Sequence, residues 1–306
     1  MTALPQDQPG RGHGVHPAHR GSIHLEDGKV LAQETWPGEQ FVLRVSAPKC
    51  AARALPGSFV HLTCDPDVPM RRPLSIQRVN VAEGWVEILY KIVGPGLRAL
   101  SRRKAGDVIS VLGPIGQPFK PDPKKPRSLL VGGGVGIPPM VFLSEWMCAQ
   151  PGKPWKPLVL MGSEIPFPFK ARPSTILVPG IPAGSIAAMP LLDGWSVPSR
   201  LASKAGFPGC YDGFVTQLAD EWLGSLDPAA KAEVEVFSCG PTPMLEAMAK
   251  VAAKHDVPCQ VSLEEFMACA VGGCAGCTVK VATPDGPAMK RVCVDGPVFD
   301  SRAVFG

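Results

Sequence analysis

The stretch CAVGGCAGC, residues 269–277, places three cysteines within nine residues and separates them only by glycine, alanine and one valine. A fourth cysteine follows after fifteen intervening residues, which gives the pattern C-x4-C-x2-C-x15-C. The four residues are Cys269, Cys274, Cys277 and Cys293. The first three have the plant-type spacing of a [2Fe-2S] cluster, in which four thiolates hold two bridged irons. The stretch therefore predicts an electron carrier.

Small residues between the thiols suit this purpose. Gly272, Gly273 and Gly276 can adopt a positive φ and so turn backbone N–H groups toward sulfur. Structural zinc is the alternative, but zinc usually takes its thiolates from two C-x2-C pairs, and only one such pair is present here. The pattern favours the cluster over zinc.

Composition limits the classes of protein that fit. The chain has 306 residues, of which 45% are hydrophobic, so two or three domains with large cores are expected. The net charge of +4 comes without a long basic stripe, which argues against a nucleic-acid partner. The N-terminus lacks a signal-peptide core, and the apolar uncharged run at residues 128–144 is broken by glycine and proline. We therefore expect a cytoplasmic protein without a membrane span. Ten cysteines in that compartment point to metal or redox chemistry rather than disulfides.

The N-terminal third divides into a tail and a β-rich domain. Residues 1–20 have no apolar periodicity and are expected to be a mobile tail, whose His13, His16 and His19 are interpreted as solvated rather than metal-binding. Residues 21–120 contain short β-rich runs separated by turns, which predicts an antiparallel barrel. The runs are FVLRVS, GSFVHLTC, RPLSIQRV, WVEILYKIV and DVISVLG. A stretch rich in proline and lysine, KPDPKKPR at residues 120–127, marks the boundary.

The rest of the chain predicts an α/β domain and a small module. In residues 121–256, apolar strands run into glycine-rich turns and then helices, which is typical of a parallel α/β domain. An insert rich in proline and glycine, near residues 165–208, fits no regular element over its length. Residues 257–306 hold the four cysteines and form the cluster module.

Two segments of the barrel resemble flavin motifs. RRPLSI, residues 71–76, is similar to the R-x-[YF]-[ST] motif of ferredoxin-NADP reductase-type flavoproteins, and LYKIVGPGL, residues 89–97, to their second flavin segment. The resemblance implies that Arg72 pairs with the FAD pyrophosphate and that Ser75 lies at the reactive edge of the ring as a catalytic residue. Leu97 stands where the family commonly has threonine. The other residues expected to bind FAD are Pro73, Leu74, Leu89, Tyr90, Lys91, Gly96 and Leu97.

Two further segments predict a nicotinamide dinucleotide site. VGGGVGIPPM, residues 131–140, is a strand-to-helix turn whose N–H groups can meet a pyrophosphate. FSCGPTPML, residues 237–245, resembles the nicotinamide site of the same flavoproteins and implies a catalytic role for Cys239. Glu164 follows a buried strand, where a carboxylate can bind an unphosphorylated ribose and favour NAD over NADP; an ordinary surface glutamate is the alternative. The remaining residues expected to bind NAD are Gly132, Gly133, Gly134, Gly136, Gly240 and Pro241.

The order of these parts is itself informative. A flavin barrel, a nucleotide domain and a C-terminal cluster module, together spanning roughly residues 22–300, resemble the electron-transfer subunits of bacterial NAD-dependent dihydroorotate dehydrogenase. The resemblance implies that FAD, a [2Fe-2S] cluster and NAD are the cofactors. It also implies a hetero-oligomeric partner, an FMN-containing catalytic subunit that oxidises dihydroorotate in pyrimidine biosynthesis.

Two alternatives stay open at this point. A ferredoxin or sulfide oxidoreductase subunit that uses NAD(P)H, or a transhydrogenase subunit, would share every motif and differ only in its partner. A zinc-stabilised binding module with a degenerate flavin fold is the alternative that is not an enzyme.

Overall fold

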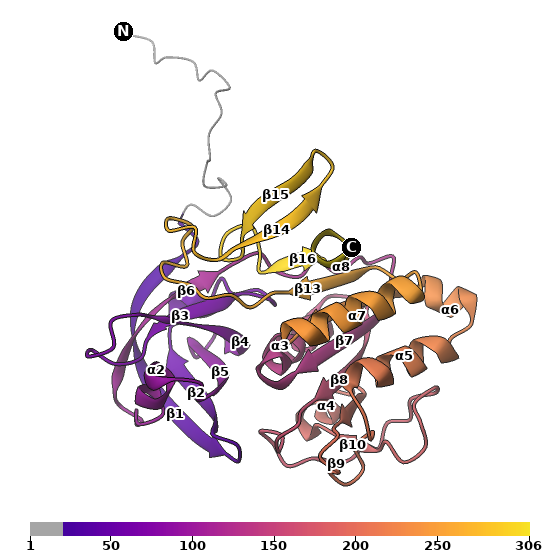
Figure 1. The fold of residues 1–306 in the computed structure, drawn as a ribbon. Coiled ribbons are helices and arrows are strands. Elements are labelled where there is room, and N and C mark those ends of the chain that lie inside the picture. The colour runs from indigo at the N-terminus through magenta and orange to yellow at the C-terminus, as the bar shows by residue number, and fades with distance from the viewer. Residues whose placement is uncertain (1–20) are drawn as a thin grey trace.

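The computed structural model describes residues 21–306, so the expected tail with His13, His16 and His19 lies outside the described residues. Six antiparallel strands close a barrel in the order β1-β2-β5-β4-β3-β6, drawn in indigo and purple in Figure 1. The strands are β1 (His24–Trp36), β2 (Gln40–Ser46), β3 (Phe59–Thr63), β4 (Arg72–Asn80), β5 (Trp85–Lys91) and β6 (Val108–Ile115). Two short helices, α1 (Pro48–Ala51) and α2 (Pro95–Leu100), fill the connections. The predicted barrel is confirmed.

A six-stranded sheet follows, with the order β11-β8-β7-β12-β13-β16. Its first five strands are parallel, and β16 joins the edge antiparallel to β13. The strands are β7 (Arg127–Gly133), β8 (Lys156–Gly162), β11 (Ser199–Ala202), β12 (Val234–Cys239), β13 (Cys259–Ser262) and β16 (Val298–Asp300). The predicted parallel α/β domain is confirmed.

Helices cover both faces of this sheet. In β7, Leu129 and Val131 pack in one core with α5 (Val215–Ser225) and α7 (Thr242–Lys254), whereas Leu130 packs with α3 (Ile137–Ala149) on the other face. This alternation is the two-residue period of a strand that is buried on both sides. The short helix α6 (Pro228–Ala232) lies at the right edge of the view, and the short helix α8 (Ser301–Phe305) lies beside β16 at the C-terminus (Figure 1).

Helix α3 joins the two domains. Its Phe142 packs in the barrel core, while Val141 packs against the sheet, so the helix is apolar on opposite sides. Arg78 of β4 donates two hydrogen bonds to Oε1 of Glu145 on α3, from Nη2 at 2.7 Å and Nε at 3.1 Å. The barrel and the nucleotide domain are therefore held at a defined angle by packing and by a half-buried ion pair.

The insert has short regular elements that the sequence did not reveal. They are β9 (Arg172–Pro173), β10 (Ala187–Ala188) and α4 (Pro190–Gly194), and β11 ends the same region. The insert also contacts the barrel, because Gln40 Nε2 donates to the Pro166 carbonyl at 2.7 Å. The guanidinium of Arg78 stacks on Trp195, with its Cζ 5.2 Å from the ring centroid.

The cysteine-bearing segment forms a small layer on top of both domains (Figure 1). It contains the hairpin of β14 (Thr278–Thr283) and β15 (Gly286–Arg291). Gln117, just after the barrel, donates its backbone N–H to the Gly296 carbonyl at 2.6 Å, and β13 and β16 belong to the nucleotide-domain sheet. The domain limits at 120/121 and 256/257 stay predictions. Among residues 21–306, every helix is too short or too polar to cross a bilayer, and the cytoplasmic location stays a prediction.

Candidate redox site

The four cysteines of the predicted cluster lie close together as two pairs. Cys274 donates its backbone N–H to the Cys269 sulfur at 3.4 Å, and the Cys277 thiol interacts with that of Cys293. The charge of Cys269 also raises the pKa of Cys293, so the two pairs are close enough to interact. Within the described residues, no three His, Cys, Asp or Glu side chains are already grouped closely enough to hold a metal ion. Two pairs of thiols fit two bridged irons, each with two protein ligands.

Backbone N–H groups surround these sulfurs. Burial raises the pKa of Cys269, but the N–H groups of Cys274, Val271 and Gly273 outweigh it and lower that pKa to about 7. Burial, together with the neighbouring Cys277 thiol, raises the pKa of Cys293 to about 12. Such N–H groups stabilise sulfur that carries negative charge, as a thiolate on iron does.

The backbone turns of the loop differ from expectation at two positions. Gly272 has the expected positive φ, at 81°, and its α-carbon lies so close to Val294 that a side chain would collide with it, at 2.6 Å. The other left-handed residues are Ala270 and Ala275, not Gly273 and Gly276. Alanine tolerates this region at a modest energetic cost.

The two flavin segments meet at Arg72 and Gly96. A β-carbon on Gly96 would lie 2.9 Å from the guanidinium carbon of Arg72, so glycine leaves room for the guanidinium in this position. Arg72 donates to the backbone carbonyls of Met70, at 2.7 Å, and Arg71, at 3.2 Å. These bonds fix the guanidinium beside Gly96, and a β-carbon on nearby Gly94 would have no neighbour within 4 Å. The arrangement fits a bound pyrophosphate.

The register of β3 and β4 gives the orientation of the RPLS residues. Leu74 lies opposite Val60, whose side chain is in the barrel core, and Ser75 lies opposite Phe59, whose side chain packs with the nucleotide-domain sheet. Since opposite residues share a face, Ser75 and Pro73 face the neighbouring domain and Leu74 packs toward the barrel interior. Their roles toward FAD stay predictions.

Three residues of the second flavin segment have buried side chains. Leu89, Tyr90 and Leu97 are at most 6% exposed, and Tyr90 stacks on Phe41 with ring centroids 5.3 Å apart. The Tyr90 hydroxyl donates to Gln33, and burial raises its pKa. These side chains lie inside the protein, whereas Lys91 is half-buried, and the contacts of all four residues with FAD stay predictions. Leu97 fills the core where a threonine hydroxyl was expected to meet the cofactor.

The glycine-rich turn and the CGP turn are packed against each other. Cys239 pairs with Gly132 across β12 and β7, so both turns leave the same edge of the sheet. A β-carbon on Gly136 would overlap the Cys239 carbonyl and lie 2.5 Å from the Gly240 nitrogen. Gly133 is equally tight against Met244, and Gly134, with a φ of 54°, has open space around it. Gly133 and Gly136 therefore allow the two turns to pack closely, whereas the backbone of Gly134 is open and could contact a phosphate.

Glu164 lies where the sequence placed it, in the exposed turn just after β8. Its Oε1 is 3.5 Å from the backbone nitrogen of Lys204, which follows β11. Pro241 is the N-cap residue of α7, directly after the CGP turn. The expected ribose and nicotinamide contacts stay predictions.

Two residues near Cys239 were missed from the sequence. Ser262 pairs with Cys239 across β13 and β12, and its hydroxyl interacts with the buried thiol. Burial and the charge of Glu264 raise the pKa of Cys239, so its thiol stays protonated at neutral pH. Solvent reaches the Glu264 side chain, yet loss of hydration around the carboxyl group raises its pKa. The sequence offered one signal for Glu264, because Glu264 and Glu265 form an acidic pair within an otherwise apolar segment.

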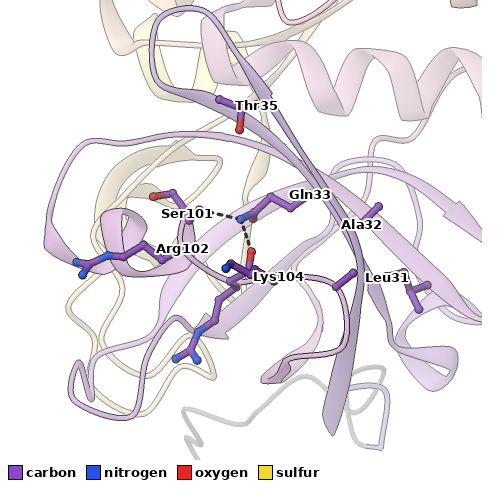
Figure 2. A pocket seen from close by; sticks show the side chains of 9 residues that line it. Leu31, Ala32, Gln33, Thr35, Ser101, Arg102 and Lys104 are labelled. Atoms are coloured by element: carbon purple, nitrogen blue, oxygen red, sulfur yellow. Dashed lines mark hydrogen bonds between the residues drawn. The ribbon is translucent and has the colours of Figure 1, made fainter.

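A large hollow of about 680 Å³ lies elsewhere, between β1 and the segment after α2 (Figure 2). Gln33 reaches across it and donates to the carbonyls of Ser101, at 3.1 Å, and Arg103, at 2.9 Å. None of the residues expected to bind a cofactor lines this hollow. It is a feature of the barrel wall.

Comparison with known proteins agrees with this arrangement. The profile of the iron-sulfur cluster binding domain of dihydroorotate dehydrogenase B matches residues 264–305, which hold all four cysteines. The electron transfer subunit of dihydroorotate dehydrogenase B (NAD(+)) from Caldanaerobacter subterraneus subsp. tengcongensis is 36% identical over 82% of this chain and 87% of its own length. This chain belongs to that family. The corresponding subunit of Desulforamulus reducens is 31% identical, over 91% and 97%.

Solved structures share the fold of this family member. An NADH-dependent reduced ferredoxin-NADP oxidoreductase superposes with a TM-score of 0.71 at 24% identity and covers 91% of this chain and 90% of its own. The ferredoxin reductase of carbazole 1,9a-dioxygenase superposes with a TM-score of 0.58 at 20% identity, over 77% and 67%. At these identities the likeness establishes the fold.

Proposed function

We propose that this chain passes electrons between NAD and an FMN-containing catalytic subunit that oxidises dihydroorotate, by way of FAD and one [2Fe-2S] cluster. The observation that carries the proposal is an apolar core that includes both the strand paired with the RPLS residues, β3, and two of the cluster cysteines. Phe59, which lies opposite Ser75, packs in the same apolar cluster as Cys277 and Cys293. The backbone hydrogen bond from Gln117, just after the barrel, to Gly296, just after Cys293, also supports a short path between the flavin and cluster sites.

The chain's residues divide the work at the flavin. Bound FAD supplies the exchange between the two-electron chemistry of NAD and the one-electron chemistry of the cluster. Arg72 and the open backbone beside Gly96 hold the pyrophosphate, and Ser75 faces the nucleotide domain. Cys239 presents an uncharged thiol, because burial raises its pKa.

The exposed surface around the cluster loop is suited to the partner. Phe266 is 94% exposed and Val271 is 45% exposed, and both lie in the segment that leads to the exposed Cys274. Large apolar side chains of this kind are enriched in protein interfaces. A catalytic subunit that docks on Phe266 and Val271 would bring its FMN toward the cluster.

The proposal is tested by reconstitution. The purified chain should show flavin and iron–sulfur absorbance, and NADH should reduce both. Dihydroorotate-dependent reduction of NAD should appear only when the FMN-containing subunit is added. A protein with both cofactors that couples to ferredoxin or sulfide but not to that subunit would favour the related oxidoreductases instead. A colourless protein that contains zinc would overturn the electron-transfer function.

A further inference from the structure

Arg291 lies where the segments of the two cysteine pairs meet. It is the last residue of β15 and precedes Cys293 by two residues. Its Nη1 donates to the carbonyl of Gly272 at 3.2 Å, and Gly272 lies in the loop between Cys269 and Cys274. The Arg291 side chain therefore connects the segment of one thiol pair to the segment of the other.

The turn that carries Cys293 is closed around the Arg291 backbone. The Arg291 carbonyl accepts a hydrogen bond from the Asp295 N–H at 2.8 Å. In return, Asp295 Oδ2 accepts from the Arg291 N–H at 2.8 Å and from its Nε at 3.4 Å. Val292 donates its N–H to the Cys277 carbonyl at 2.9 Å, so the same turn also holds the other cysteine of its pair. The Asp295 carboxylate thus fixes both the start of the turn and the direction of the guanidinium.

Gly272 fits against this turn at close range. A β-carbon on Gly272 would lie 2.6 Å from Val294 Cγ2 and 3.2 Å from Arg291 Nη1. Residues 269–277 form neither helix nor strand and are mostly glycine, alanine and cysteine, so the loop has little regular structure or apolar packing of its own. Its shape therefore depends on contacts such as the one from the guanidinium, whose side chain is 24% exposed.

We propose that Arg291 is a positioning residue, which holds the Gly272 carbonyl against the Cys293 turn and so keeps the two thiol pairs at the spacing that a [2Fe-2S] cluster needs. This inference rests on the cluster of the proposed electron path. The guanidinium acts through the Gly272 carbonyl, and Asp295 acts through the guanidinium. Without the Nη1 donor, the cluster should still assemble but be lost more readily, because the first thiol pair can move away from the second.

The test uses the full chain loaded with FAD and cluster. Arg291→Met removes the donors and keeps an unbranched apolar stem. The chelator bathophenanthroline should then remove iron about five- to tenfold faster than from the parent, as expected for one lost, partly exposed hydrogen bond. The EPR g values of the dithionite-reduced cluster should also shift, because the thiolate geometry changes. FAD content and NADH-dependent reduction of a soluble dye should match the parent.

Lys290→Met is the matched control for the loss of charge. Lys290 is the adjacent cation on β15, and it faces the other side of the hairpin because successive side chains of a strand alternate. This variant should lose iron at the parent's rate. Equal acceleration in Lys290→Met and Arg291→Met would mean that charge, and not the bond to Gly272, stabilises the cluster, and would overturn the inference. Parent-like iron loss in Arg291→Met would overturn it as well.

Asp295→Asn covers the case in which Arg291→Met does not fold. Asparagine can still accept the Arg291 N–H but no longer pairs with the guanidinium charge, so iron loss should be about two- to threefold faster. Since Asp295 acts through the guanidinium, the double variant should lose iron no faster than Arg291→Met alone. Parent-like iron loss in Asp295→Asn, or effects that multiply in the double variant, would overturn the inference. If the parent shows no [2Fe-2S] signal by EPR, the proposed function fails instead.

Discussion

Substitution of Gly136 by alanine tests the packing of the two nucleotide turns. Gly136 has a φ of −86° and a ψ of −2°, a conformation that alanine adopts without strain. The added methyl group would nevertheless overlap the Cys239 carbonyl and meet the Gly240 nitrogen at 2.5 Å. These are backbone atoms that cannot rotate away, so the CGP turn must shift. Overpacking of this kind costs about 1–3 kcal/mol, of which the better helix propensity of alanine offsets up to about 1 kcal/mol.

The cost should appear in two measurements. Urea unfolding should show a loss of about 1–2 kcal/mol in the free energy of unfolding. If the CGP turn shifts to make room for the methyl group, NADH binding should weaken by the same free energy. The KM for NADH in the reduction of a soluble dye should then rise roughly five- to thirtyfold. Gly194→Ala is the control, because Gly194 is also helical but a β-carbon there would meet no other part of the protein within 4 Å, and the variant should match or exceed the parent's stability. Parent-like stability and KM in Gly136→Ala would refute the close contact of the two turns.

Two further predictions concern the cofactor contacts. Arg72→Ala should weaken FAD binding about ten- to a hundredfold, because a charge-assisted hydrogen-bonded pair contributes about 1.5–3 kcal/mol. If FAD titration of the apoprotein gives the parent's affinity, Arg72 is misassigned. The parent should prefer NADH to NADPH and Glu164→Gln should narrow that preference, because the carboxylate repels a 2′-phosphate; equal kcat/KM for both dinucleotides in the parent would contradict this role.

Strand patterns and motif spacing made most of the fold predictable. The five β-rich runs correspond to β2 through β6, and the C-x4-C-x2-C loop lies against Cys293 as its spacing required. Strand β1 was missed because its thirteen residues, HLEDGKVLAQETW, are largely polar and exposed. It is a strand because it hydrogen-bonds to β2 and β6 on its two sides, which a local pattern does not encode.

Long-range contacts account for the rest of what was missed. The tight fit of Gly136 on Cys239 joins segments about a hundred residues apart, and the hydrogen bond from Gln117 to Gly296 joins segments almost two hundred apart. Glu264 and Ser262 came near Cys239 only because β13 pairs with β12. The residues expected to touch FAD differ in burial for a similar reason. The side chains of Tyr90 and Leu97 pack in the barrel core. Such side-chain directions depend on barrel closure, which the motif alone does not specify.

The most direct test of the electron path is Cys277→Ala, studied in the complex with the catalytic subunit. Cys277 is a buried cluster ligand candidate, and its loss leaves an iron without one thiolate, so the cluster should be incomplete or absent. The flavin and nucleotide sites precede residue 246 and should keep FAD, as absorbance would verify. The account predicts that NADH still reduces a soluble dye while dihydroorotate-dependent reduction of NAD collapses. Full dihydroorotate-dependent activity in a variant without cluster would contradict it.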